Sequence, residues 1–122
     1  MGDAELVLLA DRDHVTQILI NLLVNAMQAS DEGGAITLVA RPEEGQARID
    51  VSDTGNGIEE HDLPRVMEPF FTTRAMGTGL GLSVCRQLVE VNGGSISIAS
   101  RAGAGTVVSL RLPVIPNGEH RV

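Results

Sequence analysis

Aromatic residues are almost absent from this chain: two phenylalanines, and neither tryptophan nor tyrosine, occur among its 122 residues. Cysteine is equally scarce, since Cys85 is the only one, and this excludes an internal disulfide framework. A lone thiol is typical of a reducing compartment, so we expect a cytoplasmic location. Because Cys85 falls within a helical apolar pattern, we interpret it as an inert core residue rather than a reactive nucleophile.

Basic residues are outnumbered, with nine Lys and Arg against 16 Asp and Glu and a formal net charge of −7. Nucleic acids and anionic membranes attract basic surfaces, so we expect neither as the main partner. Long apolar runs are also lacking: none approaches the roughly 20 residues of a membrane span, and no charged-then-apolar leader opens the chain. We therefore expect no secretion signal, no membrane contact by this segment, and a chain that is a piece of a longer protein.

A length of 122 residues favours a single domain with a buried core. We place this domain at residues 3–115 and expect a disordered tail over residues 116–122. The first predicted helix follows Asp11 or Asp13 as its cap and ends at Gly33-Gly34. One apolar face of this helix recurs at three-and-four spacing through Val15, Ile18, Leu19, Leu22, Leu23, Ala26 and Ala29. A second helix is predicted over residues 80–91 and stops at Asn92-Gly93-Gly94.

Short strands are predicted between and beside these helices, at residues 5–10, 35–41, 47–53, 95–100 and 106–112. The second and third strands form a hairpin around a turn at residues 42–45, and a glycine-rich turn at residues 102–105 joins the last two. Between the strand at residues 47–53 and the second helix we predict one helical turn at residues 62–66 and a loop at residues 68–79. This order predicts an α+β fold: a two-layer α/β sandwich whose mixed, mostly antiparallel sheet has helices on one face.

Two glycine clusters are the most informative features. Asp53 ends a strand and is followed by Gly55 and Gly57, so its carboxylate can accept from a ligand donor such as the exocyclic amine of adenine. Gly77, Gly79 and Gly81 open a helix, whose free N–H groups can bind phosphates. The spacing fits neither a P-loop nor the dinucleotide fingerprint. For the first cluster the alternative is a tight turn with a surface aspartate. For the second cluster the alternative is a flexible hinge.

Asn21 and Asn25 stand four residues apart and therefore share one face of the first helix. An amide oxygen can ligate Mg²⁺, which takes few protein ligands and keeps phosphate oxygens and waters. The alternative is that both amides form hydrogen bonds with neighbouring backbone groups.

The loop between the two glycine clusters carries three further candidates. Phe70 and Phe71 either attach a mobile lid to the body of the domain or pack in the core. Arg74 either reaches a phosphate or is exposed.

Four ordered motifs resemble the N, G1, F and G2 boxes of two-component sensor histidine kinases, most closely those of the nitrogen-regulation type: residues 21–26 (NLLVNA), 53–58 (DTGNGI), 68–74 (EPFFTTR) and 77–82 (GTGLGL). The likeness continues through residues 92–96 (NGGSI), 105–106 (GT) and 112–113 (LP) and covers nearly the whole chain. It implies the Bergerat ATP-binding fold of the GHKL proteins, with ATP and Mg²⁺ as cofactors.

The resemblance implies a role for individual residues. Asn25 would ligate Mg²⁺, Asp53 would bind the adenine amine, and Thr106 would support that contact. Asn21 and Asn25 are the implied catalytic residues. The implied nucleotide-binding set is Asn25, Asp53, Gly55, Gly57, Ile58, Phe70, Thr72, Thr73, Arg74, Gly77, Thr78, Gly79, Leu80, Gly81, Leu82 and Thr106. Gln28 departs from the pattern, because many members of the family carry a basic residue there.

The resemblance implies a catalytic domain without its phosphoacceptor, because His14, His61 and His120 lack the His-Glu/Asp helix context. The expected partners are nucleotide, a separate dimerisation and phosphoacceptor domain of the same kinase, and a response regulator downstream. We expect the isolated domain to be a monomer. A GHKL-type ATP hydrolase and a non-catalytic nucleotide-binding module are the alternative functions. Hydrolases of the gyrase type carry a glutamate where this chain has Asn21, and an amide is no general base.

Overall fold

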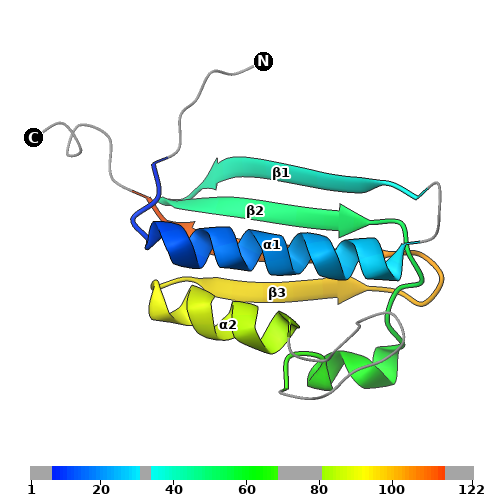
Figure 1. Cartoon of the computed structure of the whole chain (residues 1–122). Coiled ribbons are helices and arrows are strands. Elements are labelled where there is room, and N and C mark those ends of the chain that lie inside the picture. Colours follow the sequence, from blue (N-terminus) through cyan, green and yellow to red (C-terminus); the bar gives the residue numbers. More distant parts are fainter. Residues whose placement is uncertain (1–6, 31–33, 69–80, 115–122) are drawn as a thin grey trace, which may run out of the picture.

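Two layers make up the protein in a computed structural model, which describes residues 7–30, 34–68 and 81–114. One layer is a four-stranded sheet, and the other is a pair of helices packed side by side across one face of it (Figure 1). The predicted α+β sandwich with helices on one face is therefore confirmed. Among the described residues, neither helix has the length and apolar character needed to cross a membrane.

The first helix, α1, spans Arg12–Ala29. Its N-cap is Asp11, whose carboxylate accepts from the backbone N–H of His14 at 3.0 Å. The helix ends when Ser30 turns to an extended conformation, four residues before Gly34, so the predicted glycine stop lies beyond the true end. The residues it buries share one face: Ile18, Leu22, Ala26 and Ala29.

The hairpin of β1 (Ile36–Glu43) and β2 (Gln46–Asp53) turns on two residues, Glu44 and Gly45. Both have positive φ, at 51° and 82°, which is the geometry of a tight two-residue hairpin turn. The four-residue turn predicted at residues 42–45 is therefore wrong, because pairing continues through Pro42 and Glu43. Proline is tolerated there because β1 is an edge strand.

The second hairpin pairs β3 (Ser95–Ser100) with β4 (Thr106–Pro113), and the sheet order is β1-β2-β4-β3. Every pair of these strands is antiparallel, so the mixed character in our prediction is absent from the described sheet. Of the strand predicted at residues 5–10, the described part forms only an isolated bridge between Leu8 and Val114.

The remaining elements connect the two hairpins. A 3-10 helix, η1 (Glu60–Arg65), lies close to the predicted turn at residues 62–66. Helix α2 (Gly81–Val91) ends as predicted, since Gly93 has φ 82° and the Gly94 N–H donates to the Val89 carbonyl at 2.9 Å. Cys85 on α2 is fully buried against α1, and burial raises the pKa of its thiol to about 12. The prediction that Cys85 is a core residue is confirmed.

Candidate nucleotide-binding site

A row of three polar residues crosses the sheet at the end where β2 stops. Asp53 is the register partner of Thr106, and Thr106 is the register partner of Ser100 on the next strand. Register partners in an antiparallel sheet point to the same face. Two residues along, Val51 and Val108 face the helices and are buried. The polar row therefore continues an apolar floor and points to the helix side of the sheet.

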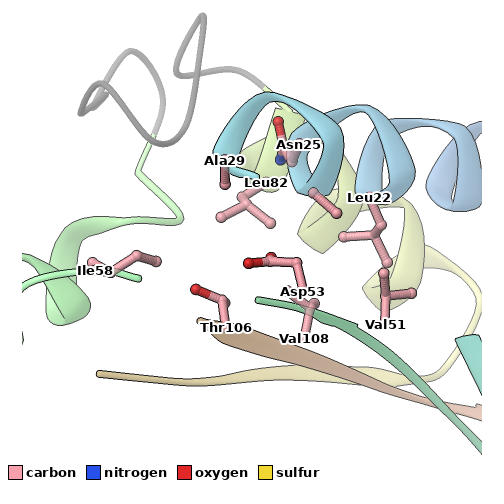
Figure 2. Close-up of a pocket in the computed structure, with 10 residues that line it drawn as sticks. Leu22, Asn25, Ala29, Val51, Asp53, Ile58, Leu82, Thr106 and Val108 are labelled. Carbon is pink, nitrogen blue, oxygen red and sulfur yellow. The ribbon is translucent and has the colours of Figure 1, made fainter. Parts of the chain in front are cut away.

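This floor forms one wall of a pocket between the sheet and the two helices. The residues that line it are Leu22, Asn25, Ala26, Ala29, Val51, Asp53, Ile58, Leu82, Thr106 and Val108. Figure 2 shows the Asp53 carboxylate and the Thr106 hydroxyl directed into the same space, with Ile58 and Leu82 at its sides. An apolar pocket with a few convergent polar groups is the usual form of a small-molecule site. The pocket suits a flat ring that has a hydrogen-bond donor at its edge.

One oxygen of the Asp53 carboxylate is held by its own loop, because Oδ1 accepts from the Gly55 N–H at 2.8 Å. The glycines of this loop are needed for close packing. A Cβ on Gly55 would overlap the carbonyl of Ala29 at the end of α1. One on Gly57 would overlap the carbonyl of Arg101 in the β3–β4 turn. The loop thus fixes the carboxylate between the end of α1 and the β3–β4 turn.

The two asparagines of α1 have different surroundings. Asn25 is half-buried and lines the pocket. Asn21 does not line the pocket, and its side-chain oxygen accepts from the amide of Gln17 at 2.9 Å. The amide of Asn25 is therefore the one positioned to contact a ligand or a cation. No group of three or more His, Cys, Asp or Glu residues that could hold a metal occurs among residues 7–30, 34–68 and 81–114.

The structure brings together five residues of the implied set as pocket lining: Asn25, Asp53, Ile58, Leu82 and Thr106. Gly55 and Gly57 build the neighbouring loop, and Gly81 is the first residue of α2. The others lie outside the described residues and stay predictions: Phe70, Thr72, Thr73, Arg74, Gly77, Thr78, Gly79 and Leu80.

Sequence reasoning missed Ser100, which contacts two of the pocket residues. Its Oγ lies 2.8 Å from Thr106 Oγ1 and accepts from the Ile58 N–H at 2.8 Å. Its only signal in the sequence is that it follows Ile96 and Ile98 in the same phase of the alternating run SISIAS, the phase that is partly buried in β3. The missing information is the strand register, which aligns Ser100 with Thr106.

The sequence profile of the family described as histidine kinase-, DNA gyrase B- and HSP90-like ATPase matches residues 10–116. The chain belongs to this ATPase family. Within the family it is similar to the solved catalytic domain of histidine kinase ThkA, with 39% identity and a TM-score of 0.75 over 85% of this chain and 68% of that one. The resemblance to sensor histidine kinases is thus confirmed.

Two further family members extend the comparison. Sensor histidine kinase ZraS of Escherichia coli K12 is 45% identical over 105 residues, which are 86% of this chain and 23% of ZraS. Full-length ShkA, solved in complex with AMPPNP, is 32% identical with a TM-score of 0.80, over 90% of this chain and 23% of that one. The chain spans about a quarter of the length of ZraS.

Proposed function

We propose that this domain binds Mg-ATP and donates the γ-phosphate to a histidine on a separate dimerisation and phosphoacceptor domain. The observation that carries the proposal is the pairing of the Asp53 carboxylate with the Thr106 hydroxyl at one end of an apolar pocket. An ionised carboxylate accepts from the exocyclic amine of adenine, and the apolar walls cover the faces of the ring. The similarity to ShkA, which was solved with AMPPNP, supports this choice of ligand.

The phosphates would extend from this pocket toward the start of α2, where Gly81 is the first helical residue. Asn25 fits a divalent cation, because its side-chain amide lines the pocket and Mg²⁺ often takes a single protein oxygen beside phosphate oxygens. The cation would neutralise charge that develops on the phosphates. This chain's own contribution is to hold the base and to position the nucleotide for an incoming imidazole.

The acceptor histidine would come from outside this chain. His14 lies in α1 beside Asn92, with Nδ1 3.0 Å from the Asn92 amide nitrogen, and His61 is exposed on η1. Both lie outside the pocket. We propose a response regulator as the final recipient of the phosphoryl group, and a cytoplasmic location and monomeric state for this domain.

The test of nucleotide binding is a calorimetric titration with a non-hydrolysable ATP analogue and Mg²⁺. Asp53→Asn removes the charged acceptor, and we expect the dissociation constant to rise about 10- to 100-fold, the usual cost of a lost hydrogen bond to a charged group. Asp13→Asn is the matched control, because Asp13 is exposed in the first turn of α1 and the change in charge is the same. Unchanged affinity in the Asp53 variant would contradict the proposed site.

The test of phosphoryl transfer mixes the domain with the phosphoacceptor domain of its parent kinase and γ-labelled ATP. We expect the label on the acceptor and slow hydrolysis by the domain alone, because Asn21 provides no general base. Binding without transfer would indicate a non-catalytic module, and rapid turnover without the acceptor would indicate a hydrolase.

A further inference from the structure

Ser100 contacts two residues of the pocket without lining the pocket itself. It is half-buried at the end of β3, and it is not among the residues that line the space between the sheet and the helices. Three groups lie within hydrogen-bond distance of its Oγ: the Ile58 N–H at 2.8 Å, Thr106 Oγ1 at 2.8 Å and the Gly105 carbonyl at 3.0 Å. Two of these partners, Ile58 and Thr106, are pocket residues.

The protons of this cluster can be assigned from the chemistry of the groups. A serine hydroxyl has one proton to donate and two lone pairs that accept. The Ile58 N–H can only donate and the Gly105 carbonyl can only accept, so the proton of Ser100 goes to Gly105. The remaining lone pair then accepts from the Thr106 hydroxyl. The reverse direction would leave Ser100 and the Gly105 carbonyl as two oxygens 3.0 Å apart without a proton between them.

This assignment gives each of the three contacts a proton and uses the whole hydrogen-bonding capacity of Ser100. A side chain whose partners are all within the protein does not bind ligand directly. It does fix the rotamer of Thr106, whose lone pairs remain for the pocket beside the Asp53 carboxylate. It also accepts a hydrogen bond from the backbone of Ile58, whose side chain lines the same pocket as Thr106 (Figure 2).

We propose that Ser100 is a positioning residue of the nucleotide pocket, which orients the Thr106 hydroxyl and holds the Ile58 wall in place. The proposal rests on the proposed function, because it assumes that Thr106 contacts the bound base. It assigns to the end of β3 a part in ligand affinity that none of the four sequence motifs contains.

The experiment is a double-mutant cycle read by calorimetric titration with AMP-PNP and Mg²⁺. Ser100→Ala should weaken binding about fivefold, the effect of one neutral hydrogen bond. In a Thr106→Val background, which keeps the side-chain shape without the hydroxyl, the same change should weaken binding less than about twofold. Ser97→Ala is the control, because Ser97 is exposed on the same strand, and it should bind as the parent does.

A rescue separates the hydroxyl from mere packing. Ser100→Thr keeps a hydroxyl at the same position, so its affinity should stay within about twofold of the parent. Ser100→Cys, with a weak donor and acceptor of similar size, gives the same comparison if the alanine variant does not fold. The melting temperature of each nucleotide-free variant reports any general loss of stability.

The outcomes distinguish this proposal from the proposed function. No binding of AMP-PNP by the parent chain, or full affinity in both the Asp53→Asn and Thr106→Val variants, would overturn the proposed function. Loss of affinity in Thr106→Val, together with an equal effect of Ser100→Ala in both backgrounds, would overturn the proposal that Ser100 orients the Thr106 hydroxyl and leave the proposed function standing. Equal losses in Ser100→Ala and Ser100→Thr would also overturn it.

Discussion

Asn25 is the polar side chain that α1 contributes to the pocket lining, beside Leu22, Ala26 and Ala29. Its position on a long, capped helix fixes the amide relative to Asp53 on the sheet. If Asn25 holds the cation and Asp53 holds the base, substitutions at the two positions should have different effects on the magnesium dependence of binding. Substitutions at Asn25 and at Asp53 would therefore report separately on the binding of the cation and of the base.

We predict that Asn25→Ala removes most of the gain in ATP-analogue affinity that Mg²⁺ provides, because no other described side chain at the pocket offers a neutral oxygen from α1. Asp53→Asn should weaken binding with and without Mg²⁺. Titrations of both variants at zero and saturating Mg²⁺ measure the difference. Asp13→Asn, in the first turn of the same helix and exposed, is the control. A full magnesium response in Asn25→Ala would contradict the assignment.

The residues of the site differ in how far the sequence reveals them. Asp53, Asn25 and Thr106 lie in recognisable motifs, and the structure brings all three to one pocket. Ser100 sits in an ordinary alternating strand, and its importance depends on being aligned with Thr106. Strand register depends on the packing of the whole sheet, so no local sequence pattern predicts it.

At the scale of elements, the β3–β4 turn packs directly on the end of β2. Gly105 has φ 93°, and a Cβ there would overlap the carbonyl of Asp53. Gly103, in the same turn, has a similar φ of 81° but open space around it. Both glycines have a positive φ, but only Gly105 also lies in close contact with the backbone of Asp53.

We predict that Gly103→Ala lowers the free energy of unfolding by about 1–2 kcal/mol, the cost of a left-handed conformation for a residue with a Cβ. Gly105→Ala should cost more, about 3 kcal/mol or above, because the Asp53 backbone must also move. Urea unfolding followed by far-ultraviolet circular dichroism measures both, since the chain has no tryptophan. Equal costs would show that the turn accommodates the added methyl group.

Element types were more predictable than element ends. The apolar spacing predicted α1 and α2, and alternation predicted the two hairpins. The end of α1 and the tight turn at Glu44 and Gly45 were missed, because both depend on contacts beyond the local sequence. Asn56, for example, donates its backbone N–H to the Ala29 carbonyl, which fixes where α1 stops relative to the loop after β2.

At the scale of the whole molecule, the sheet has a face covered by helices and a second face that carries charge. Glu43, at the end of β1, contacts two arginines of the charged face: its Oε1 accepts from Arg111 Nε at 2.8 Å and its Oε2 from Arg48 Nη1 at 3.2 Å. Arg48 also donates to Asp50 at 3.1 Å. These bonds join β1, β2 and β4 across the sheet.

The network lowers the pKa of both carboxyl groups. For Glu43, the hydrogen bonds from Arg111 and Arg48 hold the pKa below its usual range. For Asp50, burial raises the pKa, but hydrogen bonds from Ser109 and Arg48 outweigh that effect and the net shift is downward. A carboxyl group with a lower pKa in the folded state stabilises the fold above its unfolded pKa. That contribution is lost as the pH falls through the folded value.

We predict that the free energy of unfolding is nearly constant from about pH 6 to 8 and falls below about pH 4.5, where the carboxyl groups of unfolded chains begin to bind protons. Glu43→Gln should lower stability at pH 7 and make the decline in acid shallower, because one of the groups that drives it is gone. Urea unfolding at a series of pH values measures both effects.

Glu90→Gln is the control for this prediction. Its partner Arg86 lies one turn away on α2, both side chains are more than half exposed, and such surface pairs contribute little. The Glu90 variant should therefore follow the pH profile of the parent chain. If Glu43→Gln followed it equally well, the bonds among Glu43, Arg48 and Arg111 would be present in the fold without stabilising it, and the strands would depend on the helix-covered core alone.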